Sequence, residues 1–334
     1  MSLRQPYLMF LGDAADQLAA KTAIGIHYWR PDWCLGQMTL PGCQADLGLP
    51  EMSLAEAADK GVGTLVIGVA NRGGVFSPAW VEACKQALEL GMDVASGLHE
   101  RLASVPILAE TAAKTGRELF DLRHPKDVTT IATGAPRAGR RMLAVGTDCS
   151  VGKMFTMLAV EREMKARGWK ADFRATGQTG IFIAGTGISV DAVVSDFLAG
   201  SVEDLSPANE PDHWDLIEGQ GSLFHPSFAG VSLGLLHGAQ AEALVMCHQP
   251  GREHMRGLPG RPLPSLEECI ALNEQCAALT APGAKVIAIA ANTSAMTEAE
   301  AEAYLSETAA RLGMPCVDPV RSGVAALVDA VATL

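Results

Sequence analysis

A glycine loop between a predicted strand and a predicted helix constrains the fold of this chain more than any other feature. Residues 141–145 form a short apolar run, and the loop Gly146-Thr-Asp-Cys-Ser-Val-Gly-Lys153 follows it directly. Residues 153–168 then show helical patterning. Glycines let successive backbone N–H groups point at one anion, while a helix N-terminus and a lysine add positive charge. The segment therefore predicts a phosphate-binding strand–loop–helix unit inside an α/β domain.

The loop departs in two ways from the common phosphate-binding pattern. Five residues separate Gly146 from Gly152, which resembles the dethiobiotin synthetase type of P-loop, and Met154 stands where a Ser or Thr hydroxyl normally holds Mg²⁺. A thioether is a poor ligand for a hard cation, and Thr156 lies too far along the helix to replace it. We therefore expect phosphate binding with no metal. The residues expected to contact the cofactor are Gly146, Thr147, Asp148, Cys149, Ser150, Val151, Gly152, Lys153 and Met154.

The remaining apolar runs predict two α/β domains. Strands are expected at 7–11, 64–70 and 93–96, with helices at 54–60 and 78–90 between them, and this rhythm predicts a small Rossmann-like parallel sheet over residues 1–135. A Gly/Pro/Arg-rich stretch at 132–141 reads as the linker. Later strands at 214–217, 243–247 and 285–291 predict a larger, doubly wound, P-loop NTPase-like domain over residues 136–334.

Composition excludes several classes of partner. The net charge is −12, whereas general nucleic-acid binders are usually basic, so no nucleic acid is expected. No run of about 18 apolar residues predicts a membrane helix. The eight cysteines are scattered without a C-x-x-C pair, which indicates reduced thiols in the cytoplasm and argues against a zinc site.

Further candidate site residues lie where predicted strands end. Glu218 follows the strand at 214–217 and precedes a glycine turn, and His225 comes shortly afterwards. Asp191 follows a second glycine-rich segment, in which it either caps a helix or acts on substrate. The segment from His248 to Arg252 follows another strand and could contact a phosphate or an adenine. The residues expected to bind a small-molecule substrate are Arg72, Arg174, Thr176, Gln178, Thr179 and Arg321.

Four segments occur together in a known order. They are Gly-Thr-Asp-Cys-Ser-Val-Gly-Lys-Met from 146, Arg-Ala-Thr-Gly-Gln-Thr-Gly-Ile from 174, Ile-Glu-Gly-Gln-Gly-Ser-Leu-Phe-His-Pro from 217 and Asp-Pro-Val-Arg-Ser-Gly from 318. With them, the chain resembles the D-glutamate N-acetyltransferase family over nearly its whole length. The resemblance implies a Rossmann-like domain followed by a P-loop domain. It also implies acetyl transfer from acetyl-CoA to the amine of D-glutamate, in D-amino-acid catabolism.

This reading agrees with the chemistry of the loop. Coenzyme A carries a 3′-phosphate and a pyrophosphate, which a glycine loop can hold without a metal. Acetyl transfer needs a general base, for which Glu218, Asp191 and His225 are alternatives, and donors that stabilise the thioester oxyanion. A dicarboxylate acceptor needs cations, for which Arg72, Arg174 and Arg321 are candidates.

Two other functions remain open from the residues. A Mg-ATP-dependent ligase or kinase of the dethiobiotin synthetase type would turn over ATP with Mg²⁺, and Met154 argues against it. A non-catalytic nucleotide sensor would bind tightly without forming a product. The Gly-rich, apolar composition also makes us expect a homo-oligomer.

Overall fold

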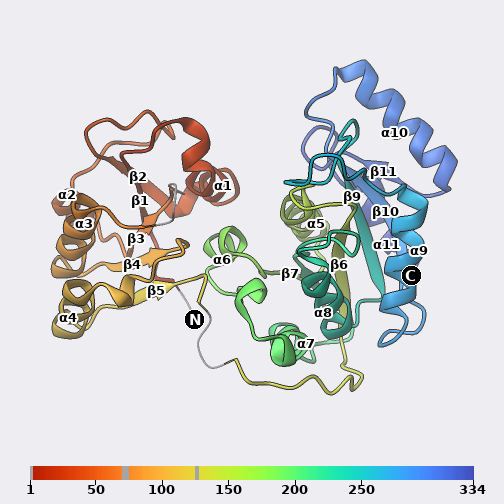
Figure 1. Ribbon diagram of the computed structural model, residues 1–334, viewed down its shortest axis with the longest axis horizontal. Coiled ribbons are helices and arrows are strands. Elements are labelled where there is room, and N and C mark those ends of the chain that lie inside the picture. Colours follow the sequence, from red (N-terminus) through yellow and green to blue (C-terminus); the bar gives the residue numbers. More distant parts are fainter. Residues whose placement is uncertain (1–2, 70–74, 125–127) are drawn as a thin grey trace. The chain divides into compact units, whose positions relative to one another are not determined.

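The chain divides into two units, each built on its own parallel sheet. In a computed structural model of the protein (Figure 1), residues 3–69, 75–124 and 128–334 are described. The first unit comprises Met1–Lys126 together with Gly177–Ala192, and the second comprises Asp127–Thr176 together with Val193–Leu334. Residues 177–192 therefore join the first unit although they lie inside the segment that we assigned to the C-terminal domain.

The first unit is built on a five-stranded parallel sheet. Its strands run in the order β2-β1-β3-β4-β5. Their bounds are β1 Tyr7–Gly12, β2 Cys34–Thr39, β3 Thr64–Ile67, β4 Asp93–Ser96 and β5 Leu119–Asp121. Every residue of β1, β3 and β4 is buried, as expected for a parallel sheet covered on both faces.

Short helices surround this sheet. They are α1 Lys21–Trp29, α2 Leu54–Asp59, α3 Pro78–Glu89, α4 Pro106–Thr115 and α6 Gln178–Ala184, with 3₁₀ turns at Gln17–Ala20, Pro31–Trp33, Leu102–Ser104 and Val190–Ala192. Local sequence sets their ends. Ser53 caps α2 in a capping box with Glu56, Ser77 caps α3 ahead of Pro78, and α4 ends at the left-handed Gly116.

The second unit contains a six-stranded parallel sheet in the order β11-β10-β9-β6-β8-β7. Its strands are β6 Arg140–Gly146, β7 Ala171–Arg174, β8 Trp214–Ile217, β9 Ala243–His248, β10 Lys285–Ala291 and β11 Cys316–Val317. The central β6 pairs with β8 on one side and β9 on the other. Loops that leave the carboxyl ends of these three strands therefore meet at one edge, which is where ligands bind in doubly wound sheets.

Helices cover both faces of this second sheet. They are α5 Lys153–Ala166, α7 Ser195–Leu205, α8 Ala229–Ala239, α9 Leu266–Ala277, α10 Glu298–Leu312 and α11 Ala325–Val331. Helix α5 packs on β6, β7 and β8 and contacts α11, while α8 packs on β6 between α7 and α9 (Figure 1). Capping boxes start α9 at Ser265 and α10 at Thr297.

The predicted fold class is confirmed in both units, with small shifts at element ends. The strands at 93–96, 214–217 and 285–291 have the predicted bounds. The strand predicted at 64–70 ends earlier, at Ile67. Strands β2, β5, β7 and β11 were not predicted; β2 contains Gly36 and Gln37, which break the apolar run that marked the other strands.

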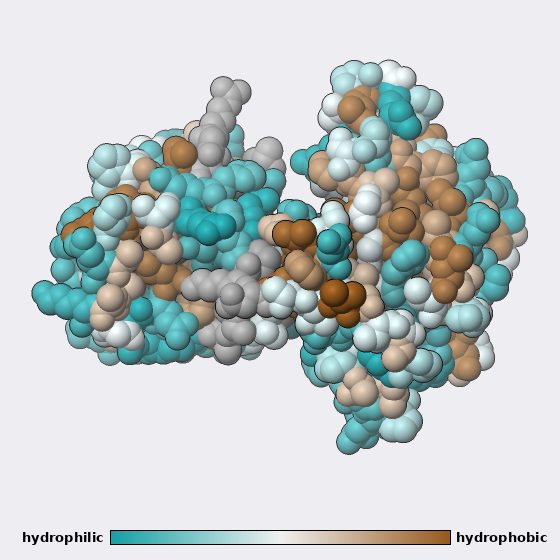
Figure 2. Space-filling model, turned by 60° about the horizontal axis from the view of Figure 1, so that its bottom comes forward, coloured by the Kyte–Doolittle hydropathy of each residue, from teal (hydrophilic) through white to brown (hydrophobic). Residues whose placement is uncertain are grey.

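Surface hydropathy is mixed. Polar and apolar residues alternate over the visible face in Figure 2, and large apolar side chains that are well exposed occur in both units, for example Tyr28 and Ile107 in the first and Val194 and Phe228 in the second. The predicted homo-oligomer stays a prediction. Of the helices in the described ranges, none has the length and hydropathy that a bilayer crossing requires.

Candidate phosphate site

The predicted phosphate loop joins β6 to α5 in the second unit. Its backbone enters the left-handed region twice, at Ser150 (φ +53°) and at Gly152 (φ +104°). Glycine adopts this conformation without steric cost, which explains position 152. Ser150 has a Cβ, and a non-glycine residue at positive φ persists where surrounding contacts hold it.

The turn that leads into α5 carries unpaired backbone donors. Helices α2, α9 and α10 begin with Ser or Thr side chains that accept a hydrogen bond from the first turn, whereas α5 begins after Gly152 with no side-chain cap. Within the described ranges, no acceptor occupies the N–H groups of Ser150, Val151 or Gly152. Uncapped donors at a helix N-terminus form a binding site for an anion.

Lys153 adds a buried positive charge to these donors. The residue is 6% exposed, and its Nζ donates to the carbonyl oxygen of Asp148 at 2.8 Å. Burial lowers the pKa of Lys153, and nearby Cys247, Cys149, Asp148 and Glu218 oppose that effect only in part. An anionic ligand would stabilise the charged amine that burial disfavours.

Asp148 ties the loop to the segment after β9. Its Oδ2 accepts hydrogen bonds from the Arg252 guanidinium at 2.7 Å and from the Arg256 backbone N–H at 2.8 Å. Burial raises the pKa of Asp148, but these donors outweigh burial and hold the pKa below its ordinary value. Its Oδ1 is buried without a hydrogen-bond partner among the described residues. The ionised carboxylate thus anchors two donors of one neighbouring loop.

Hydrogen bonds to the last residues of β9 hold the start of the phosphate loop. The Thr147 N–H donates to the Cys247 carbonyl oxygen at 3.1 Å, and the Thr147 hydroxyl lies 3.0 Å from His248 Nδ1. Burial, together with the positive charges of Arg252 and Arg311, lowers the pKa of His248 to about 4. His248 is therefore neutral near pH 7.

The side chains after Lys153 do not form a magnesium site. Met154 offers no oxygen. The Thr156 hydroxyl donates to the Gly152 carbonyl at 3.0 Å and lies 3.4 Å from Cys247 Sγ, inside the helix. Both residues therefore lack a hydroxyl that could hold a metal bound to the loop's phosphate.

Glu218 lies at the carboxyl end of β8, beside this loop, as its position in the sequence predicted. The side chain is 4% exposed, and its Oε2 accepts from the Thr176 N–H at 2.9 Å. The Thr176 hydroxyl donates to the Glu218 carbonyl at 2.7 Å. A Cβ on the next residue, Gly219, would lie 1.7 Å from the Ala144 carbonyl oxygen, so only glycine fits there. This contact brings Glu218 close to Lys153.

His225 is held by two backbone hydrogen bonds. Its Nδ1 accepts from the Ser227 N–H at 3.2 Å, so Nε2 carries the proton and donates to the Arg256 carbonyl at 3.1 Å. Neither nitrogen is then available to take a proton from a substrate. This arrangement identifies His225 as a support for the segment that contacts Asp148.

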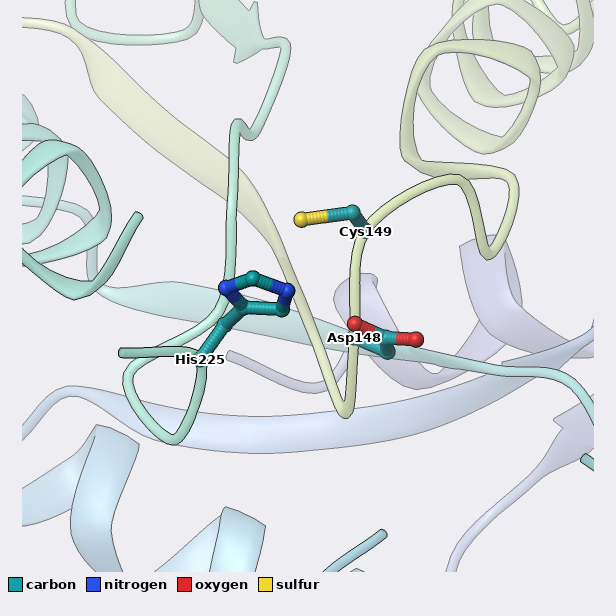
Figure 3. A group of neighbouring side chains, drawn as sticks. All are labelled: Asp148, Cys149 and His225. Carbon is teal, nitrogen blue, oxygen red and sulfur yellow. The ribbon is translucent and has the colours of Figure 1, made fainter. Parts of the chain in front are cut away.

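Asp148, Cys149 and His225 lie close together, with potential ligand atoms within 4.8 Å of one another (Figure 3). The hydrogen bonds do not suit a metal ion. A coordinating imidazole nitrogen carries no proton, whereas Nε2 of His225 carries one, and the positive Arg252 contacts the same carboxylate. The three side chains fit a hydrogen-bonded support better than a cation site.

Two predicted substrate cations are occupied elsewhere in the second unit. The Arg174 guanidinium pairs with the buried Asp215 on the neighbouring strand, at 2.7 Å. Arg321 donates to the carbonyl oxygens of Thr293 and Met296, at 3.2 and 2.9 Å. The structure brings neither guanidinium to the phosphate loop among the contacts described.

Three other predicted residues belong to the first unit. The Gln178 side-chain oxygen accepts from Arg123 Nη2 at 2.7 Å when its amide nitrogen faces the Gly97 carbonyl. Thr179 lies on the side of α6 that approaches α1. Asp191 is 47% exposed and lies 3.6 Å from Arg123. Arg72 lies outside the described residues.

The structure adds two residues of the loop after β9, Arg252 and Arg256, to the candidate site, since both donate hydrogen bonds to Asp148. In the sequence, Arg252 was only a weak candidate, as the last residue of a segment after a strand that could contact a phosphate or an adenine. Arg256 was missed because it acts through its backbone N–H, which leaves no signal in residue identity.

Family models match most of the chain. A P-loop domain of unknown function, the C-terminal part of DUF1611, matches residues 130–328. A Rossmann-like domain, the N-terminal part of DUF1611, matches residues 38–125. These descriptions agree with the two sheets seen in the structure.

Two curated relatives are similar over nearly full length. A protein of Tritonibacter scottomollicae named D-glutamate N-acetyltransferase is 56% identical, over 99% of this chain and 100% of its own. A protein of a Pseudoalteromonas species with the same name is 46% identical, over 98% of this chain and 99% of its own.

One solved structure is similar throughout. It is the crystal structure of a DUF1611 family protein from Anabaena variabilis, with 34% identity and a TM-score of 0.85, covering 99% of this chain and 100% of that one. The phosphate loop thus lies in a fold shared over the full length of its relatives. The chain belongs to the DUF1611 family, whose members join a Rossmann-like domain to a P-loop domain.

Proposed function

We propose that this protein transfers the acetyl group of acetyl-CoA to the amino group of D-glutamate. The observation that carries the proposal is the set of unpaired N–H groups at Ser150, Val151 and Gly152 beside the buried Lys153. The name of the two curated relatives, D-glutamate N-acetyltransferase, supports the same reaction. This set of donors suits the phosphates of coenzyme A.

Phosphate binding at this loop needs no metal. Lys153 supplies a full positive charge, and the helix N-terminus supplies partial positive charge and donors. Met154 offers no oxygen and the Thr156 hydroxyl is engaged, so the position after Lys153 lacks the hydroxyl that normally holds Mg²⁺ in a P-loop. ATP hydrolysis or phosphorylation would need such a ligand, so these residues favour a carrier of phosphates that is not itself cleaved at phosphorus.

Coenzyme A separates its phosphates from its thioester by the whole pantetheine arm. Groups that contact the phosphates therefore cannot also contact the acetyl carbon. Glu218 lies next to Lys153, so we assign it to phosphate-site electrostatics and to holding Thr176. His225 has both nitrogens engaged and is assigned to support.

Of the three candidate bases, Asp191 is the one that belongs to the first unit and makes no described contact with the phosphate loop. Its carboxylate is half-exposed and has one described ionic contact, with Arg123 at 3.6 Å. We propose that it removes a proton from the substrate ammonium, which leaves a neutral amine to attack the thioester carbonyl. The thiolate of coenzyme A leaves and is protonated. Arg72 stays a proposed contact for a carboxylate of the acceptor.

The test follows thiol release from acetyl-CoA by the purified protein in EDTA, with D-glutamate or L-glutamate as acceptor. We expect release that requires D-glutamate and is insensitive to EDTA. Absence of release with every amino acid, together with Mg²⁺-dependent ADP formation from ATP, would overturn the proposal in favour of an ATP-dependent ligase.

Two variants test the division of roles. Asp191→Asn should lower kcat and leave the KM for acetyl-CoA near the wild-type value, whereas Glu218→Gln should act mainly on that KM. The opposite pattern would place the acetyl group, and not the phosphates, at the glycine loop.

A further inference from the structure

Arg252 holds three consecutive residues of the phosphate loop. One guanidinium nitrogen donates to Asp148 Oδ2 and to the Cys149 carbonyl, both at 2.7 Å. The second donates to the Ser150 carbonyl at 3.2 Å and also contacts Gln249. The side chain is 17% exposed. A single planar group thus gathers acceptors from the outer side of the loop.

These contacts determine where the loop's donors point. In a trans peptide, the C=O of one residue and the N–H of the next point in opposite directions. The Cys149 and Ser150 carbonyls face Arg252, so the N–H groups of Ser150 and Val151 face away from it. These two N–H groups are among those left without an acceptor in the described structure.

A second contact holds the same loop from its other side. Lys153 Nζ donates to the Asp148 carbonyl, while Arg252 binds the carboxylate of that residue. Asp148 also accepts from the Arg256 N–H, and His225 in turn holds the Arg256 carbonyl. The loop that follows β9 is thereby fixed against the phosphate loop.

We propose that Arg252 is a positioning residue that keeps the phosphate loop in its anion-binding conformation before any ligand or metal arrives. Ser150 occupies the left-handed region, which costs free energy for a residue with a Cβ. The Arg252 hydrogen bonds to the Cys149 and Ser150 carbonyls, which flank the Ser150 Cα, offset that cost. The identity of the ligand as coenzyme A rests on the proposed function, but the conformational role does not.

The test compares Arg252→Ala with a control from the same loop, Arg261→Ala. The Arg261 side chain is exposed, and its described hydrogen bonds, to Met255 and Leu258, involve only its backbone. Two quantities are measured in EDTA: hydrogen–deuterium exchange of peptides covering 147–155 in the ligand-free protein, and the Kd of coenzyme A by calorimetry.

For Arg252→Ala we expect faster exchange of the loop without ligand and about 10- to 100-fold weaker coenzyme A binding, as for loss of hydrogen bonds from a charged donor. The kcat at saturating acetyl-CoA should change little, and millimolar guanidinium should restore part of the affinity. Arg261→Ala should match the wild type in every measurement.

Three outcomes would overturn the inference. Unchanged exchange with weaker binding would mean that Arg252 touches the ligand directly and does not shape the loop. Unchanged exchange and unchanged Kd would remove any role for it. Faster exchange throughout the second unit would indicate a general loss of stability. If the wild type binds no coenzyme A, the proposed function fails, whereas exchange and pyrophosphate binding still decide the role of Arg252.

Discussion

Replacing Lys153 with Met should stabilise the ligand-free protein and weaken ligand binding at once. Lys153 is 6% exposed, and burial lowers its pKa, so its charged form is held at a cost in free energy. Met has a similar length and no charge. Burying one ion costs several kcal/mol, whereas the hydrogen bond to the Asp148 carbonyl that the Met variant loses is worth less, so we expect the free energy of unfolding to rise by about 1 kcal/mol or more.

The loss in affinity follows from the same charge. A unit charge about 4 Å from a phosphate oxygen contributes about 4 kcal/mol at an effective dielectric constant of about 20. Desolvation of the amine offsets part of this, and each 1.4 kcal/mol is tenfold in Kd. Lys153→Met should therefore bind coenzyme A about 10²- to 10³-fold more weakly.

The pH dependence gives a further check on Lys153. Its pKa is lower in the folded state than the ordinary value of 10.5, so between these two values the unfolded chain binds more protons. The free energy of unfolding contributed by this group therefore rises with pH across that window, and its penalty is fully present below the folded-state pKa. The Met variant should lack this rise, and coenzyme A should suppress it in the wild type.

Thermal unfolding and calorimetry in EDTA, at pH 7 and pH 9, test all three expectations. Lys114→Met is the control, since Lys114 is exposed in α4 of the other unit. A Lys153→Met variant that is less stable without ligand, or that binds coenzyme A as the wild type does, would refute the reasoning that Lys153 is a charge kept for an anion.

Three further predictions concern the neighbouring residues and the donor. Gly219→Ala would place a Cβ 1.7 Å from the Ala144 carbonyl oxygen and should reduce the free energy of unfolding by about 3 kcal/mol or more in a denaturant titration. Gly230→Ala, with open space around it, should not reduce it. Equal stability of the two variants would disprove the close contact. His225→Ala should lower the free energy of unfolding by about 1–3 kcal/mol, because both ring nitrogens form hydrogen bonds with backbone groups. The inflections of the pH–rate profile should stay at the same pH values. Loss of an inflection would make His225 an acid or base in the reaction. Acetyl-pantetheine, which lacks the phosphates, should show a KM at least about 10²-fold above that of acetyl-CoA in the thiol-release assay with kcat retained, and an equal KM would contradict phosphate binding at the loop.

Local patterns predicted the elements that are buried on both faces. The segments that became β1 and β10 are largely continuous apolar runs, which parallel strands covered by helices require, and β4 and β8 contain shorter apolar runs. Strand β2 was not predicted because Gly36 and Gln37 interrupt its apolar residues. The assignment of residues 177–192 to the first unit could not be predicted, because local pattern says nothing about which sheet a helix packs against.

Some features of the candidate site depend on one loop alone, and others depend on contacts between residues far apart in the sequence. Gly152 and Lys153 act through the backbone conformation and charge of one loop, so residue identity predicted the phosphate loop. The Arg174–Asp215 ion pair depends on the register of two strands far apart in sequence, and the tautomer of the His225 ring depends on carbonyl and N–H partners from the fold. Neither could be derived from spacing along the chain.

The length of coenzyme A links the phosphate loop to an acetyl-transfer site that it does not itself contain. If the loop holds the phosphates, changes at Lys153 or Arg252 act on binding, and changes at the base act on kcat. The two classes of variant should then be additive in free energy, because sites that share no contact partner behave independently, and Lys153 and Asp191 share none among the described contacts. Strong coupling between Lys153→Met and Asp191→Asn in kcat/KM would instead require direct contact between the groups around the anion and the reacting amine, and would move the acetyl transfer to the loop.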